Sequence, residues 1–233
     1  MNADTTHMLD ELTLLLPELS PAQRAQFARY YELLTEHNAR VNLTAIVDPV
    51  EVARKHFADS VAPAALIPRG SACIDVGTGA GFPGVALKIA RPDISLTLLD
   101  SLAKRVSFLT ALLEELRIGA RCIHARAEDA GRDPALRERF DAVLSRAVAP
   151  ANVLLELTIP FARTQGCSIM YKGAQAQEEL DAAQGAAQKL HCALTLENYA
   201  AAWGTRSCIV ARKLRPTASA YPRKPAAIRN KPL

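Results

Sequence analysis

The chain has few features of a membrane, metal-binding or secreted disulfide-bonded protein. Among its 233 residues no apolar run approaches the roughly 18 residues that a membrane span requires. The first residues include Asp4 and Asp10 but no basic cluster, so we expect no signal peptide. The five cysteines form no CxxC pair, and most lie in apolar, strand-like runs. We therefore expect buried, reduced thiols, no metal site and a cytoplasmic protein.

Acidic residues are absent from the last part of the chain. None follows Glu197, whereas eight lysines and arginines do. Because the whole chain carries a net charge of +4, residues 1–197 carry −4 and the remainder carries +8. A basic end on a mildly acidic body indicates a polyanionic partner, although a solvated tail that only aids solubility fits the charge equally well.

The pattern of apolar residues divides the chain into three parts. Residues 1–66 are expected to form a helical extension, because Ser20-Pro21-Ala22-Gln23 and Asp48-Pro49-Val50-Glu51 each resemble a capped helix start, with a turn over 37–44 between the two helices. Residues 67–215 alternate strands and helices, which predicts an α/β fold with a doubly wound, mostly parallel, seven-stranded sheet. Residues 216–233 contain four prolines and no core pattern, so an extended basic tail is expected.

The expected elements of the central part have definite bounds. Strands are expected near 72–76, 94–99, 121–125, 140–145, 167–172, 192–198 and 207–212. Helices are expected near 83–90, 102–117, 150–162 and 175–190. The connection between the last two strands is short, which indicates that one of them runs antiparallel.

A glycine-rich loop follows the first expected strand and leads into a helix, an arrangement that binds nucleotide-like ligands. The third glycine of the dinucleotide fingerprint, which lets the helix pack closely on the strand, would fall on Phe82. The D-x-G-x-G-x-G spacing of Asp75, Gly77, Gly79 and Gly81 is instead typical of S-adenosylmethionine sites in methyltransferases. An NAD-dependent enzyme is therefore the least favoured alternative.

Two further segments extend this predicted site. Asp100 ends the second strand 23 positions after Gly77, where a carboxylate can accept hydrogen bonds from both ribose hydroxyls. The alternative is that Asp100 only caps the next helix. Backbone groups at Ala127 and Glu128, after the third strand, are placed to read the edge of an adenine ring.

The end of the fourth strand lacks the usual signs of amine or carbon methylation. An Asn/Asp-Pro-Pro-aromatic motif is missing there, and no cysteine nucleophile lies in the loop. This leaves acceptors that are already nucleophilic, such as guanine N7, which needs no general base. We therefore assign no catalytic residue. Arg146 is placed to contact a carboxylate of the cofactor or the acceptor base, or else to pair with Asp100, Glu128 or Asp141.

Together these segments resemble the bacterial 16S ribosomal RNA guanine-N7 methyltransferase G family, also called the glucose-inhibited division protein B family. The similarity covers about residues 20–215 and rests on short segments spread along the chain. They are His37-Asn38 with Val41-Asn42-Leu43-Thr44, His56 with Asp59-Ser60, Asp75 to Gly84, Leu98 to Ser101 with Lys104-Arg105, Leu144 to Ala147, and Tyr171-Lys172-Gly173. The ending Tyr221-Pro222-Arg223-Lys224 with Lys231-Pro232-Leu233 is also similar to the tail of many members. His37 stands where most members have tryptophan. This departure affects any stacking role of the side chain at that position and leaves the expected activity unchanged.

The resemblance implies a class I methyltransferase fold and methyl transfer from S-adenosylmethionine to N7 of a guanine near the decoding site of the small ribosomal subunit. It implies cofactor contacts at Gly77, Phe82, Ala127, Glu128 and Arg146. The partner is then 16S rRNA or the small subunit, bound by a monomer. Candidate RNA contacts, most of them cations that could hold phosphates, are His56, Lys104, Arg105, Lys172, Arg223, Lys224, Arg229 and Lys231.

Two alternatives to this function stay open at the level of sequence. One is a methyltransferase that acts on a small molecule, which the basic tail disfavours. The other is an RNA-binding or assembly factor that has the fold but performs no catalysis.

Overall fold

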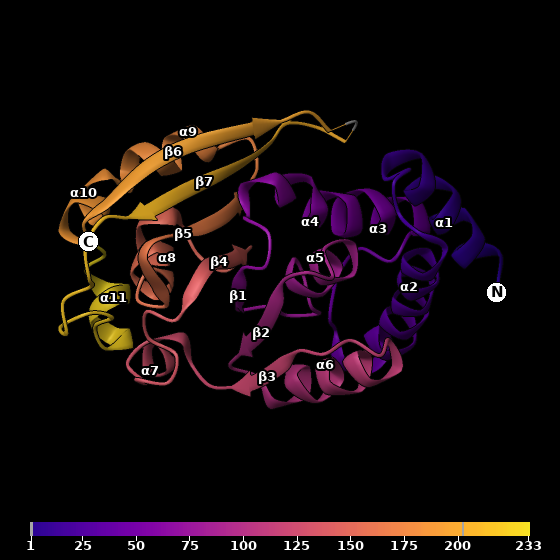
Figure 1. The fold of residues 1–233 in the computed structure, drawn as a ribbon, viewed down its shortest axis with the longest axis horizontal. Helices are drawn as coiled ribbons and strands as arrows, with labels where there is room; N and C mark the ends of the chain where they lie inside the picture. Colours follow the sequence, from indigo (N-terminus) through magenta and orange to yellow (C-terminus); the bar gives the residue numbers. More distant parts are fainter. Residues whose placement is uncertain (1, 202) are drawn as a thin grey trace.

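The computed structural model describes residues 2–201 and 203–233, and its centre is a seven-stranded sheet flanked by helices (Figure 1). The strand order is β3-β2-β1-β4-β5-β7-β6. The strands are β1 (Ala72–Val76), β2 (Ser95–Asp100), β3 (Arg121–His124), β4 (Phe140–Arg146), β5 (Ala162–Lys172), β6 (Cys192–Tyr199) and β7 (Arg206–Lys213). Among the described strands, β7 alone runs opposite in direction to the other six, which confirms the predicted doubly wound, mostly parallel sheet.

Helices precede the sheet and alternate with its strands. The N-terminal helices are α1 (Ala3–Leu15), α2 (Pro21–Val41), α3 (Pro49–Val52), the π-helical segment η1 (Ala53–Ala58), α4 (Asp59–Val61) and the 3₁₀ segment η2 (Ala62–Leu66). Those between and after the strands are α5 (Gly84–Ala90), α6 (Ala103–Glu115), α7 (Ala127–Ala130), α8 (Ala151–Thr158), α9 (Ala176–Ala182), α10 (Gln184–Lys189) and α11 (Pro225–Asn230).

Buried residues on the two faces of the sheet form two separate apolar cores. Successive side chains of a strand point to opposite faces, so Cys73 packs into one core while Ile74 packs into the other. The first core includes residues of α1, α2, α5 and α6, and the second includes residues of α8, α9 and α10. The N-terminal helices therefore cover one face together with α5 and α6, rather than forming a separate unit (Figure 1).

Local capping explains where the N-terminal helices begin. Ser20 and Gln23 form both hydrogen bonds of a capping box at the start of α2, and the Asp48 side chain accepts from the Glu51 backbone N–H at the start of α3. Both predicted helix starts are confirmed. The turn predicted over 37–44 is shorter than expected because α2 continues to Val41, and Asn42 then ends it in the left-handed conformation with φ 50°.

One predicted helix is shorter than expected and another is divided in two. The helix expected over 150–162 ends at Thr158, and β5 begins at Ala162, because Pro160 has no N–H to continue the helical hydrogen bonds. The helix expected over 175–190 is divided at Ala183 into α9 and α10.

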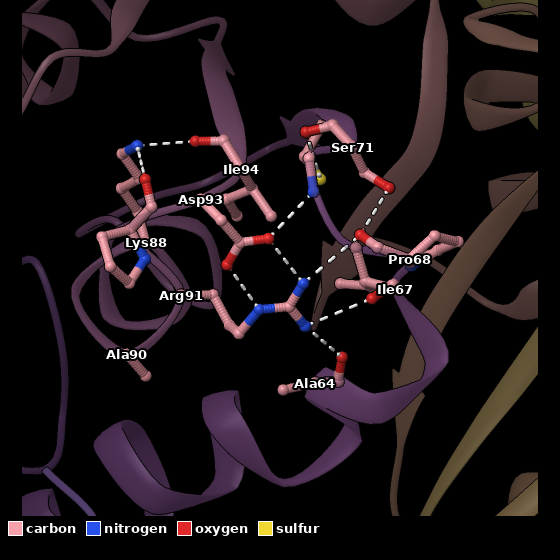
Figure 2. Close-up of polar contacts among 12 residues, drawn as sticks. Ala64, Ile67, Pro68, Ser71, Lys88, Ala90, Arg91, Asp93 and Ile94 are labelled. Atoms are coloured by element: carbon pink, nitrogen blue, oxygen red, sulfur yellow. Dashed lines mark hydrogen bonds and ion pairs between the residues drawn. The ribbon is translucent and has the colours of Figure 1, made fainter.

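Arg91, at the end of α5, connects the N-terminal helices to the sheet layer (Figure 2). Its guanidinium donates two hydrogen bonds to the Asp93 carboxylate, at 2.7 and 2.8 Å, which hold the pKa of that carboxyl well below its usual range. The same group donates to the backbone carbonyls of Ala64, Ile67 and Pro68. Because carbonyls at a helix end lack intrahelical partners, Arg91 caps η2 and fixes the chain just before β1.

The C-terminal segment is folded against the domain, so the extended tail predicted for 216–233 is wrong. It contains α11, and Ile228 of this helix is buried with 3% of its surface exposed. Arg223 donates from its backbone N–H and its guanidinium to Glu156 of α8, whose side chain is 1% exposed. The composition of the segment does not reveal this packing, because Arg223 pairs with Glu156, a residue 67 positions earlier in the chain.

Replacing Arg223 should therefore destabilise the protein. In Arg223→Met, the buried Glu156 carboxylate loses its cation, and we expect the free energy of unfolding to fall by about 3–5 kcal/mol. Denaturant titration measures this directly. The neighbouring Lys224 is exposed and is the matched control, because Lys224→Met should change stability by no more than about 0.5 kcal/mol. Equal stability of the two variants would contradict a structural role for the pair.

Candidate active site

The buried carboxylate of Asp75 organises the glycine-rich loop after β1. Its Oδ2 accepts hydrogen bonds from the Thr78 hydroxyl at 2.6 Å and from the Gly84 backbone N–H at 2.8 Å. Burial raises the pKa of Asp75 to about 6, although both hydrogen bonds act to lower it. Asp75 thus links the end of β1 to the first residue of α5 by a hydrogen bond that spans the glycine-rich loop.

Two loop glycines meet different surroundings. A side chain at Gly81 would collide with the protein, because its Cβ would lie 2.6 Å from the Tyr30 hydroxyl, which donates to the carbonyl of Ala80. Gly79 has φ +61°, and a Cβ there would have no described protein atom within 4 Å. Gly81 is therefore required by packing, whereas Gly79 leaves room for a ligand to approach the backbone.

A cavity of about 250 Å³ lies at the carboxyl ends of β1 and β2. Among its lining residues are Gly77, Asp100, Ala127 and Glu128, which the sequence assigned to one cofactor site. Asp100 accepts from the Gly79 backbone N–H through Oδ2 and from the Leu102 backbone N–H through Oδ1, both at 2.9 Å. Leu102 is the N-cap residue of α6, so this bond closes a turn before the helix, and the expected capping of the helix by Asp100 is not observed.

A second cavity, of about 570 Å³, lies beside the first. Its walls include His56 and Asp59 from the N-terminal helices, Arg146 from β4 and Arg206 from β7. Val148 and Ala149 line both cavities and so form their common wall. A small ligand in the first cavity and a group in the second would therefore lie on opposite sides of one short loop.

Arg146 belongs to the second cavity. Its guanidinium donates to the Asp59 carboxylate and the Ser60 hydroxyl, each at 3.3 Å, and to the backbone carbonyl of Lys55 at 3.2 Å. The expected alternative partners have other cations: Asp100 lies 3.6 Å from Arg105, Glu128 3.1 Å from Arg126, and Asp141 pairs with Arg163. Arg146 therefore forms an ion pair, as the second alternative predicted, but its partner is Asp59 and none of the three expected carboxylates.

Asp59 connects three parts of the chain through its carboxylate. Besides Arg146, it contacts Arg206 Nε at 3.1 Å and accepts from the Tyr199 hydroxyl at 3.4 Å. Tyr171 of β5 donates to the backbone carbonyl of Ser60 at 2.9 Å. The helix bearing His56, Asp59 and Ser60 is thereby held over the carboxyl ends of β4 and β5.

His56 is held in its neutral form beside this cluster. Burial, and next the positive charge of Arg146, lower the pKa of His56 to about 3. Nδ1 lies 3.4 Å from an Arg146 nitrogen, which can only donate, so Nδ1 accepts and the Nε2–H donates to the Thr44 hydroxyl at 2.7 Å. His56 lines the second cavity.

Phe82 lies inside a stack of side chains rather than in either cavity lining. Its ring stacks on Tyr30 with centroids 5.2 Å apart and on His56 with centroids 4.5 Å apart. The Arg146 guanidinium carbon lies 5.2 Å from the Phe82 ring centroid. Phe82 therefore packs the glycine loop against the N-terminal helices, and its contact with a cofactor stays a prediction.

The predicted RNA-binding cations fall into two groups. Lys104, Lys224, Arg229 and Lys231 are exposed, and Arg105 lies partly exposed against Asp100. Lys172 and Arg223 instead make internal contacts, with Glu179 and Glu156 respectively. Their charges are already paired with buried or half-buried carboxylates, which distinguishes these two residues from the exposed cations.

Several residues of the site could not be found from the sequence. Tyr30, Glu179 and Arg206 belong to no motif, and each reaches the site from an element distant in the chain. The sequence places Tyr171 only within the resemblance, without a role, and Lys172 only as a candidate RNA contact. Within residues 2–201 and 203–233, no helix is both long enough and apolar enough to cross a membrane.

The low pKa of His56 predicts a pH-dependent contribution to stability. Between about pH 6.5 and 3 the unfolded chain binds a proton at this site that the folded protein does not, so acidification favours unfolding. Relative to His56→Gln, which cannot titrate, the wild-type protein should lose about 1.4 kcal/mol of unfolding free energy per pH unit from pH 6 to pH 4. Denaturant titrations of both proteins at several pH values test this, and parallel curves would show that His56 titrates normally.

A family model for rRNA small subunit methyltransferase G matches residues 23–202. The protein named ribosomal RNA small subunit methyltransferase G from Lactobacillus delbrueckii subsp. bulgaricus is 43% identical over 224 residues, which cover 93% of this chain and 94% of the relative. The protein of that name from Desulfitobacterium hafniense is 44% identical over 220 residues, which cover 93% and 92%.

Solved structures of low sequence identity share the fold. A methyltransferase from Pyrococcus furiosus is 13% identical with a TM-score of 0.56, covering 82% of this chain and 99% of its own. A tRNA methyltransferase from B. subtilis is 12% identical with a TM-score of 0.53, covering 69% and 66%. These likenesses agree with a class I methyltransferase fold, and the match over most of its length shows that the chain belongs to the rRNA small subunit methyltransferase G family.

Proposed function

We propose that this protein transfers a methyl group from S-adenosylmethionine to N7 of a guanine in 16S rRNA, near the decoding site of the small ribosomal subunit. The observation that carries the proposal is the pair of cavities that meet at Val148 and Ala149. The smaller cavity is lined by four of the predicted cofactor residues, Gly77, Asp100, Ala127 and Glu128. The relatives' names, which specify small-subunit ribosomal RNA, support the substrate. Such a substrate would place the protein in the cytoplasm.

The residues around the smaller cavity fit the chemical groups of S-adenosylmethionine. Asp100 offers carboxylate lone pairs for the ribose hydroxyls, and Ala127 and Glu128 offer backbone groups for the adenine edge. Leu99 and Leu157 provide apolar surface of the kind an adenine ring requires. The empty space beside Gly79 allows a ligand to approach the loop backbone. A solved neighbour in complex with AdoMet has a TM-score of 0.50, so it supports the fold and not these individual contacts.

Methyl transfer to N7 requires alignment rather than proton removal. When bound, S-adenosylmethionine supplies a methyl group on a positively charged sulfur, which keeps the electrons of the broken C–S bond while the N7 lone pair forms the new bond. The neutral His56 and the paired Asp59 agree with this, because the His56 Nδ1 and the Asp59 carboxylate already accept from Arg146, and Asp59 also pairs with Arg206. The cleft residues therefore act by excluding water and orienting the acceptor base.

We further propose that exposed cations contact the RNA backbone. Lys104 and Arg105 stand at the start of α6 beside Asp100, and Lys224, Arg229 and Lys231 stand on or beside α11. Contacts of this kind add affinity that falls as salt rises, without selecting a base sequence.

Transfer of labelled methyl from S-adenosylmethionine tests the function directly. We expect label in 16S rRNA presented as free RNA or within small subunits, and recovery of the label as 7-methylguanosine after digestion. Label in another nucleoside would overturn the choice of acceptor. Transfer to metabolites alone, or RNA binding without transfer, would favour one of the two alternatives left open by the sequence.

The cofactor loop has its own test in a matched pair of glycines. Gly79 and Gly70 have φ +61° and +71°, and neither has a described atom within 4 Å of an added Cβ. Gly79→Ala and Gly70→Ala should therefore each cost about 1–2 kcal/mol of stability through backbone strain. Only Gly79→Ala should also weaken S-adenosylmethionine binding, by at least about tenfold, because its methyl group occupies the ligand's approach. Titration calorimetry compares the two, and equal affinities would remove Gly79 from the cofactor site.

A further inference from the structure

The loop from Ala147 to Pro150 is the wall shared by the two cavities. Val148 and Ala149 line both of them, and Val148 also packs so closely on the glycine loop that a Cβ at Gly77 would lie 2.7 Å from its Cγ2. Ala147 has φ 55°, a conformation that non-glycine residues seldom adopt. A strained loop keeps one conformation only when neighbouring groups hold it, so the side chains that bind this loop determine its shape.

Two side chains from outside the loop provide that support. Lys172, at the end of β5, donates from Nζ to the Ala149 carbonyl at 3.0 Å and to Glu179 Oε2 at 2.6 Å. Glu179, on α9, accepts through the same Oε2 from the Ala151 backbone N–H at 2.8 Å. This one ion pair therefore binds the backbone on both sides of Pro150: the Ala149 carbonyl near the end of the loop and the Ala151 N–H at the start of α8.

The burial of this pair distinguishes it from a surface phosphate contact. The Lys172 side chain is only 8% exposed and that of Glu179 is 28% exposed. The positive charge of Lys172 is opposed by a carboxylate at hydrogen-bonding distance, which removes most of its attraction for a distant anion. The Glu179 carboxylate in turn holds the first N–H of α8, one of the groups that a helix leaves without an internal partner.

We propose that Lys172 and Glu179 are positioning residues for methyl transfer, which hold Ala149 and Ala151 so that the two cavities stay aligned across their common wall. The proposal rests on the function proposed above. Both residues also line the second cavity, but the proposed role requires no contact of either with the cofactor or the acceptor. They act through the loop backbone, whose displacement by a fraction of an ångström would misalign donor and acceptor.

Three substitutions and two matched controls test the proposal. Glu179→Ala and Lys172→Met remove the pair, and Glu179→Gln keeps an oxygen for the Ala151 N–H while losing the charge. Glu178 lies next to Glu179 on α9, Lys189 lies on α10, and both are exposed. Glu178→Ala and Lys189→Met therefore remove like charges without touching the loop. Each full-length variant is measured for thermal stability, hydrogen exchange of residues 147–151, turnover and the salt dependence of rRNA binding.

The expected result is a loss of alignment without a loss of RNA affinity. In Glu179→Ala and Lys172→Met, amide exchange at 147–151 should speed up about tenfold or more and turnover at saturating substrates should fall about tenfold, with Glu179→Gln between these and the wild type. The KM for RNA and its salt slope should stay unchanged, as should all values of the controls.

Two results would overturn the proposal. If Lys172→Met reduces the salt slope by about 0.7–0.9 and leaves turnover intact, Lys172 is a phosphate contact. If exchange at 147–151 does not change in either variant, the pair does not hold the loop. The exchange measurement needs no substrate, so it is decisive even if the wild-type protein transfers no methyl group to rRNA, an outcome that would count against the proposed function alone.

Discussion

The contact between Arg146 and Asp59 is the interaction on which the arrangement of the site depends. It joins the end of β4 to the helical segment that precedes the sheet, across 87 positions of the chain. The Arg146 side chain is 14% exposed and that of Asp59 is 8% exposed, so neither charge could be left alone without a large desolvation cost. A buried pair of this kind contributes little net stability but strongly favours one placement of the helix over others.

Because this helix is held in one place, the acceptor side of the cleft is assembled from both parts of the chain. His56 and Asp59 come from the N-terminal helices, whereas Arg146 and Arg206 come from the sheet. The N-terminal helices are therefore part of the proposed active site as well as a cover for one face. Arg91 secures the same connection at the opposite end of β1, where it caps η2 and pairs with Asp93 (Figure 2).

The donor and acceptor sides share physical supports. Phe82, in the glycine loop, stacks between Tyr30 and His56, and His56 in turn contacts Arg146. The loop 147–150 forms the second link, since it borders both cavities. For a reaction that needs alignment and no proton transfer, a rigid relation between two cavities is what the protein must provide. The polar groups of the cleft accordingly hold the structure together, and burial, followed by the positive charge of Arg146, lowers the pKa of His56.

The sequence by itself determined the features that depend on neighbours in the chain. The spacing of Asp75, Gly77, Gly79 and Gly81 indicated a strand, a tight loop and a helix, and the capping residues Ser20 and Asp48 located two helix starts. These are recognisable because their hydrogen bonds span only a few residues. The gathering of Asp100, Ala127 and Glu128 around one cavity also followed from sequence, since the carboxyl ends of neighbouring parallel strands meet at one edge.

Only the tertiary structure decided which carboxylate pairs with Arg146, that Arg223 holds the C-terminal segment onto α8, and that Lys172 supports a loop. Each of these pairings joins residues from different elements, and a charge in the sequence is compatible with many partners until packing of the two cores brings one of them within reach.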